Sequence, residues 1–298
     1  MKFLKFSILL LFFVAFETKA QKWEAGQTYS DPEKLVSFIV GDIPLVISVP
    51  HGGTILLPDM PTRDCKGAVT VTDTRSIELA MEIQKAFLAK YNVRPFIIYT
   101  NISRKQVDQN REMEEGTCGN KDMNKYWIQF HDYIDTAVSL AGKKFGKVVY
   151  IDLHGHGHTK QRLEIGYGPN ADIFRDFDKQ NAATLAPKTS VNNLLVADKN
   201  ANLKDLIYGK NSFGTLIQDA GYGAVPSRQD PYPLDEDKYF NGGYNTRWYT
   251  SNKYPMVFGW QIESNYKGVR DAEGRPQFAK AFVDVMATYF KTYLNFKL

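Results

Sequence analysis

Two kinds of apolar pattern alternate along the chain. Compact apolar runs, typical of buried strands, occupy residues 45–49, 94–100, 147–153 and 256–262. Between and after them, apolar positions recur at helical spacing in residues 74–91, 121–144 and 275–296. Asp73 or Thr74 is placed to cap the first of these helices. This alternation predicts an α/β fold, with a mostly parallel mixed sheet flanked by helices on both faces.

Polar side chains follow several of the predicted strands at the point where each strand ends. His51, Asn101, His154 and Glu263 each lie just past the carboxyl end of such a run. In open α/β sheets, ligands bind beyond the carboxyl ends of the strands. We therefore expect these four residues to gather on one rim of the sheet, although they are far apart in sequence.

The first twenty residues differ in character from the rest. Lys2 and Lys5 precede an apolar run over residues 6–16, and Thr18-Lys19-Ala20 forms a small-x-small cleavage site. This pattern predicts a secretory signal peptide over 1–20, followed by a single domain over 21–298. An uncleaved membrane anchor is the alternative. The prediction places the mature protein in the periplasm or outside the cell, with no stable membrane insertion after cleavage.

Charge and cysteine content narrow the function classes. The formal net charge is +4, and removal of the first twenty residues leaves about +2, with the basic residues scattered. So small a charge argues against a nucleic-acid partner. The two cysteines, Cys65 and Cys118, belong to no Cys-x-x-Cys pair, and export would allow them to form a disulfide. A role as metal ligands is the other interpretation.

Four of the five histidines lie in glycine-rich loops at strand ends. Neutral imidazole is a good zinc ligand, and a catalytic zinc usually takes three protein groups and a water. His51 and His154 are the strongest candidates, and the run from His154 to His158 also reads as a metal-binding tract in which His156 and His158 take part. Asp152 is a candidate partner for a ligand histidine, or a buried strand residue paired elsewhere.

A third ligand and a base are also needed. Asp73 is placed to approach His51, and Glu78, inside the predicted helix, is the other candidate for the third ligand. Glu263 ends an apolar strand, where a carboxylate is unfavourable unless it is paired or functional. Beside a metal-activated water, it would act as the general base.

Two arginine-containing segments indicate an anionic substrate. Ser103-Arg104 precedes Asp108-Gln-Asn110-Arg111, and a glycine-led loop runs from Gly242 through Tyr244 to Arg247. Arginine offers a planar fork that binds carboxylates with two hydrogen bonds. We expect Arg104, Asn110, Tyr244 and Arg247 to contact the substrate, and Arg111 to stabilise a developing oxyanion.

Taken in order, these motifs resemble one enzyme family. The set is Val49-Pro-His51-Gly-Gly, Asp73-Thr, Ser103-Arg104 with Asp108-Gln-Asn-Arg111, Asp152-Leu-His154, Gly242-Gly-Tyr-Asn-Thr-Arg247 and Gln261-Ile-Glu263. It resembles the N-formylglutamate amidohydrolase family. The sequence departs from the related zinc carboxypeptidases at residue 54, where Thr replaces the Glu of their His-x-x-Glu pair. It also extends Asp152-Leu-His154 with Gly-His-Gly-His in place of the family's usual serine.

The resemblance implies a fold like the zinc carboxypeptidases and aspartoacylases. It implies one Zn²⁺ held by His51, Asp73 and His154, with Glu263 activating water. Arg111 would steady the oxyanion or the substrate, and Arg247 would clamp a substrate carboxylate. The expected activity is hydrolysis of an amide on a small carboxylate-bearing substrate.

Two other functions remain open at this point. A secreted zinc peptidase, or a hydrolase of γ-glutamyl or cell-wall peptides, would use the long region 159–245 to line or roof its cleft. A non-catalytic protein that binds carbohydrate or peptide would use the 17 Tyr, 19 Phe and 4 Trp residues. The oligomeric state cannot be predicted from the sequence.

Overall fold

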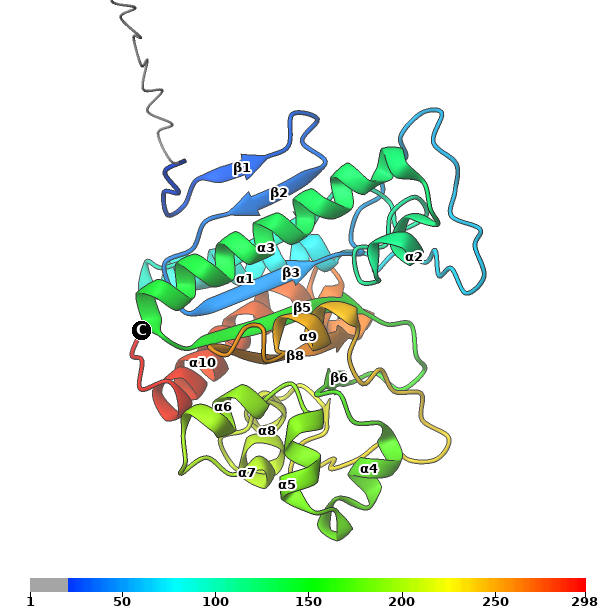
Figure 1. The fold of residues 1–298 in the computed structure, drawn as a ribbon. Helices are drawn as coiled ribbons and strands as arrows, with labels where there is room; N and C mark the ends of the chain where they lie inside the picture. The colour runs from blue at the N-terminus through cyan, green and yellow to red at the C-terminus, as the bar shows by residue number, and fades with distance from the viewer. Residues whose placement is uncertain (1–20) are drawn as a thin grey trace, which may run out of the picture.

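The computed structural model describes residues 21–298, so the predicted signal peptide lies outside the described residues (Figure 1). Eight strands form one sheet in the order β1-β2-β4-β3-β5-β8-β6-β7. The strands are β1 (Thr28–Ser30), β2 (Val36–Ile39), β3 (Leu45–Val49), β4 (Phe96–Thr100), β5 (Val148–Gly155), β6 (Leu163–Gly166), β7 (Ala224–Val225) and β8 (Val257–Ser264). The central strands β4, β3, β5 and β8 run parallel, whereas β1, β2 and β6 each have antiparallel neighbours. The predicted mostly parallel mixed sheet is confirmed.

Helices cover both faces of the sheet (Figure 1). They are α1 (Ser76–Tyr91), α2 (Met113–Thr117), α3 (Asn124–Phe145), α4 (Ala171–Arg175), α5 (Ala182–Leu185), α6 (Asn192–Ala197), α7 (Leu203–Tyr208), α8 (Phe213–Asp219), α9 (Tyr244–Tyr249) and α10 (Gly274–Tyr293). Because side chains alternate along a strand, Ile47 packs on the α1 and α10 side while Val46 packs on the α3 side. Two apolar layers therefore hold the sheet between them.

The long elements lie where the sequence predicts them. The runs at 45–49, 94–100, 147–153 and 256–262 form β3, β4, β5 and β8, and the helical patterns form α1, α3 and α10. The strands β1 and β2 have only three and four residues, too few to show a period in a polar lead-in. Neither Asp73 nor Thr74 caps α1, because the residue before that helix is Arg75, in the left-handed region with φ 69°.

The region 159–245 forms β6, β7 and a group of short helices beyond β8 (Figure 1). Leu194, Leu206 and Phe213 from this group are buried in the same apolar layer as α1 and α10. The region therefore extends the core rather than roofing the sheet. Among residues 21–298, no helix combines the length and the apolar character that crossing a bilayer requires.

The carboxyl ends of β3, β5 and β8 carry the predicted site residues to one rim. His154 on β5 is the register partner of Glu263 on β8, and Glu263 is in turn the partner of Glu164 on β6. Partners in a ladder project from the same face of the sheet. The three side chains thus lie in one row across neighbouring strands, on the face that α3 and α9 cover.

Candidate metal centre and catalytic cleft

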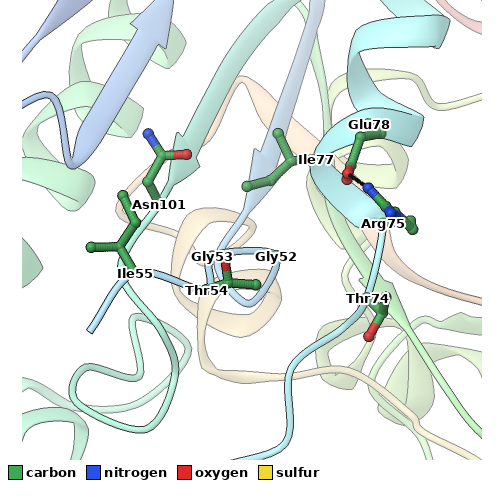
Figure 2. A pocket seen from close by; sticks show the side chains of 9 residues that line it. All are labelled: Gly52, Gly53, Thr54, Ile55, Thr74, Arg75, Ile77, Glu78 and Asn101. Carbon is green, nitrogen blue, oxygen red and sulfur yellow. Dashed lines mark hydrogen bonds and ion pairs between the residues drawn. The ribbon is translucent and has the colours of Figure 1, made fainter.

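The loop after β3 brings His51 close to the start of α1, and glycine permits the approach. A Cβ on Gly52 would lie 2.6 Å from Ser76 Oγ, and one on Gly53 would lie 2.3 Å from the carbonyl oxygen of Ile102. Figure 2 shows this turn between Ile77 of α1 and Asn101 at the end of β4. Packing therefore requires the two glycines that follow His51.

The hollow drawn in Figure 2, of about 670 Å³, is lined by two of the candidates, Glu78 and Asn101, but by none of His51, Asp73, His154 and Glu263. Its two charged side chains, Arg75 and Glu78, pair with each other at 2.5 Å, so Glu78 is not part of the metal cluster. Asn101, which we expected on the site rim, lines this hollow and donates its side-chain amide to the carbonyl of Lys34.

A smaller cleft of about 420 Å³ collects almost all the predicted site residues. Its lining consists of His51, Val69, Val71, Asp73, Arg104, Asn110, Arg111, His154, Gly155, His156, Gly157, His158, Phe240, Asn241, Gly242, Gly243, Arg247, Gln261 and Glu263. Segments from six separate parts of the chain meet here, and three of the four residues that the strand-end argument selects, His51, His154 and Glu263, are among them.

At the bottom of the cleft, His51, Asp73 and His154 converge through one atom each. Asp73 Oδ2 lies 2.9 Å from His154 Nδ1 and 3.4 Å from His51 Nδ1, and all three side chains are buried. Four-coordinate zinc with bonds of about 2.0–2.1 Å would place ligand atoms about 3.3 Å apart. The spacing therefore matches one small divalent cation.

The outward-facing nitrogens of both histidines are held by buried carboxylates. His51 Nε2 lies 2.7 Å from Asp108 Oδ1, and His154 Nε2 lies 2.8 Å from Asp152 Oδ2. Each Nε2–H donates to its carboxylate, so a bound cation would meet the Nδ1 atom of each histidine. A second carboxylate behind each ligand histidine is the arrangement that fixes the tautomer in metal sites.

Electrostatics also favour a cation at this point. Burial by itself raises the pKa of Asp73, but the hydrogen bond with His154 and the nearby His51 hold that pKa well below its usual range. Burial lowers the pKa of His154, and Asp152 and Asp73 more than reverse that effect. Meanwhile the buried His51 Nδ1 has no hydrogen-bond partner among the described residues. Two imidazole Nδ1 atoms and a carboxylate oxygen that face one point are a donor set that fits Zn²⁺.

Glu263 lies beside this cluster on the neighbouring strand. Gln261 donates to Glu263 Oε1 at 3.0 Å, and the second carboxylate oxygen has no hydrogen bond among the described residues. Burial raises the pKa of Glu263 to about 8, with Asp73 and Glu164 adding to the effect and His154 opposing it. A cation on the cluster would lower that pKa again. The group is thus placed, and has the acidity range, to exchange protons near neutral pH.

The predicted anion-binding residues lie at the cleft, with one exception. Asn110 contacts His154 Nε2 at 3.2 Å, and Arg104 donates to Asp108 at 2.9 Å. Arg111 pairs with Glu115, whereas Arg247 forms no ion pair with any residue in 21–298. Tyr244 is the exception, because its ring packs against Trp127, His131 and Trp248 instead of lining the cleft.

Several site residues escape prediction from the sequence. Asp108 belongs to the Asp-Gln-Asn-Arg motif, which by itself predicts no role for it. The structure places its carboxylate behind His51, between Arg104 and Arg63. Glu164 and Phe240 belong to the region for which no local pattern predicts a position. Glu164 is a carboxylate in an apolar run, which is the same signal that selects Glu263.

The histidine tract divides between two roles. His154, His156 and His158 all line the cleft, but only His154 joins His51 and Asp73. His156 donates from Nε2 to the carbonyl of Arg162 and accepts at Nδ1 from the His158 backbone N–H, so neither nitrogen is free for a metal.

The loop that carries Val69 and Val71 to the cleft is tied down by a covalent bond. Cys65 and Cys118 form a disulfide with Cα atoms 5.5 Å apart, so neither serves as a metal ligand. The buried Arg63 supports the same loop by donating to the carbonyls of Val69 and Arg104.

Comparison with known proteins gives the fold. No family model matches the chain, and no curated protein matches it in sequence. A crystal structure of N-formylglutamate amidohydrolase from Ralstonia eutropha JMP134 aligns with a TM-score of 0.52 at 14% identity, over 88% of this chain and 98% of that one. The chain shares the fold of N-formylglutamate amidohydrolase.

Two further structures align less closely. A gene product from Agrobacterium tumefaciens gives a TM-score of 0.48 at 14% identity, covering 87% of this chain and 95% of that one. A metallo-carboxypeptidase from Pseudomonas aeruginosa gives 0.36 at 11% identity, covering 91% and 65%. The fold that the six motifs imply is confirmed by the alignment with N-formylglutamate amidohydrolase.

Proposed function

We propose that the chain is an exported zinc-dependent amidohydrolase that cleaves an amide on a carboxylate-bearing substrate. The observation that carries the proposal is the convergence of His51, Asp73 and His154 on one point, with Glu263 on the adjacent strand. Bound Zn²⁺ would supply Lewis-acid chemistry, polarising an amide carbonyl and lowering the pKa of a water to about 7.

The protein's own groups would handle the proton and the substrate. Glu263 would accept a proton from the attacking water on the oxygen that Gln261 leaves free, and then pass it to the departing nitrogen. Arg111 would donate to the oxyanion or the substrate. Arg247, with no acidic partner among the described residues, would hold a substrate carboxylate.

Two observations support export. The first twenty residues have the pattern of a signal peptide, and the disulfide between Cys65 and Cys118 is of a kind that persists in oxidising compartments. An extracytoplasmic amide, such as a peptide or a γ-glutamyl or cell-wall fragment, would then be the substrate.

The test pairs metal content with turnover. Glu263→Gln should retain zinc, measured by elemental analysis, while losing about 10²–10⁴-fold in kcat on N-acylglutamates. Glu273→Gln, an exposed carboxylate at the start of α10, is the matched control and should leave kcat unchanged. Undiminished turnover in the Glu263 variant would exclude it as the base. A protein that binds no zinc and hydrolyses no amide when zinc is supplied would be a binding protein instead.

A further inference from the structure

A second carboxylate–histidine pair lies in the cleft, separate from the metal cluster. His158 Nδ1 donates to Glu164 Oε1 at 2.7 Å, and the His158 ring stacks on Phe240 with centroids 4.9 Å apart and planes 20° apart. Glu164 is 1% exposed, and its other oxygen accepts the backbone N–H of Phe240 at 2.8 Å. The His158 ring is therefore fixed on two sides.

This pair leaves one polar atom available to a ligand. With Nδ1 engaged by Glu164, the remaining nitrogen of His158 is Nε2, which makes no hydrogen bond within residues 21–298. The side chain is 15% exposed and lines the cleft. A second metal ion is a poor occupant, because both nitrogens of His156 are already used and only two ligands would remain.

The position of the pair follows from strand register. The strands β5, β8 and β6 are neighbours in that order (Figure 1). Glu164, Glu263 and His154 are register partners across them, with Glu263 in the middle. Strands in a sheet are about 4.8 Å apart, so Glu164 lies about 10 Å from His154. An extended substrate spans about 3.3–3.6 Å per residue, so this distance corresponds to about three residues.

The side of the substrate also follows. If Glu263 returns its proton to the departing nitrogen, the leaving amine must lie on the Glu263 side of the metal ligands. The His158–Glu164 pair lies beyond Glu263 in the same direction. A substrate whose leaving part is a single amino acid would not extend to it.

Resting on the proposed function, we propose that His158 and Phe240 form a subsite for the leaving portion of an extended, peptide-like substrate. His158 Nε2 forms a hydrogen bond with a backbone or side-chain polar group about three residues beyond the scissile amide. The face of Phe240 packs against the same part. Glu164 is a positioning residue that fixes the tautomer and orientation of His158.

The test compares N-acetylglutamyl-alanine with N-acetylglutamyl-trialanine, both cleaved at the first Glu–Ala amide. The leaving part is a single alanine in the first substrate and three alanines in the second. His158→Phe keeps an aromatic ring on Phe240 and removes the nitrogen. It should lower kcat/KM about tenfold for the longer substrate and less than about twofold for the shorter one. Thr159→Ala is the control: Thr159 is an exposed neighbour whose side chain makes no hydrogen bond within residues 21–298, so the change should alter neither value.

An equal loss of kcat/KM on both substrates would show that His158 only supports the structure of the site. An unchanged kcat/KM on the longer substrate would show that His158 forms no subsite. Either result overturns the proposal. If the unaltered protein hydrolyses neither substrate, the proposed amidohydrolase function fails. Titration calorimetry with trialanine then tests the subsite independently: binding that weakens about tenfold in His158→Phe supports it, and equal or absent binding overturns it.

Discussion

The carboxylate behind His154 offers a sharp test of how the metal cluster is built. Asp152 accepts from His154 Nε2 at 2.8 Å and from Ser48 Oγ at 2.5 Å, and it is completely buried. Asp152→Asn keeps the shape and can still accept from Ser48 through its oxygen. Its amide then faces His154 Nε2–H with a second donor, so the imidazole must move its proton to Nδ1.

That proton would sit on the atom that faces Asp73, where the metal must bind. Loss of such a partner weakens metal binding about 10–100-fold, which corresponds to about 1.4–2.7 kcal/mol. We therefore expect the zinc dissociation constant of Asp152→Asn to rise by that factor. Competition with a chromophoric chelator measures it, while circular dichroism checks that the fold persists.

Ser48→Ala is the matched control. It removes a hydrogen bond to the same carboxylate, contributing about 0.5–1.5 kcal/mol to folding, but leaves the His154 proton on Nε2. Its zinc affinity should stay close to that of the unaltered protein. If Asp152→Asn bound zinc as tightly as the unaltered protein, Nδ1 coordination by His154 and the tautomer argument would both be wrong.

Three further predictions concern the frame and the base. Gly53→Ala should lower the free energy of unfolding by about 1–3 kcal/mol and weaken zinc binding, because its Cβ would lie 2.3 Å from a backbone oxygen. Gly157→Ala, which has open space around it, is the control and should change neither quantity. Thermal unfolding measures the stability, and competition with a chelator measures the zinc affinity. Cys65→Ser with Cys118→Ser should lower the free energy of unfolding by about 4 kcal/mol, since the bridge closes a 53-residue separation; a denaturant midpoint equal to that of the oxidised protein would contradict this. Because the folded pKa of Glu263, about 8, exceeds the ordinary carboxyl value, the folded state binds its proton more tightly, so this group destabilises metal-free protein progressively from about pH 5 to pH 8. The melting temperature of metal-free Glu263→Gln should thus be higher than that of the unaltered protein at pH 8, and the two should converge near pH 5. A difference in melting temperature that does not change with pH would refute the raised pKa of Glu263.

The sequence by itself determined the framework and most of the candidate site. Long periodic segments such as α1, α3 and β5 reveal themselves because each buries a regular apolar face. His51, His154 and Glu263 could be selected because parallel strands end at one edge of the sheet, although the same rule also selects Asn101, which lines the other hollow.

Tertiary structure decided which polar groups face one another. Asp73 has an equally good local interpretation as a helix cap, and only the return of the chain past His154 directs its carboxylate to the histidines. Tyr244 and Arg247 share one short helix, yet the helix turns Tyr244 toward Trp127 and Arg247 toward the cleft.

The row from His154 through Glu263 to Glu164 depends on the register between strands that are distant in sequence. His154 on β5 is more than a hundred residues from Glu263 on β8, and a long insertion separates β6 from β8. No local propensity encodes register of that kind, because it is set by how two complete apolar layers pack against the sheet. For the same reason the His158 pair, though visible as a histidine in the sequence, acquires its place in the cleft only once β6 lies antiparallel beside β8.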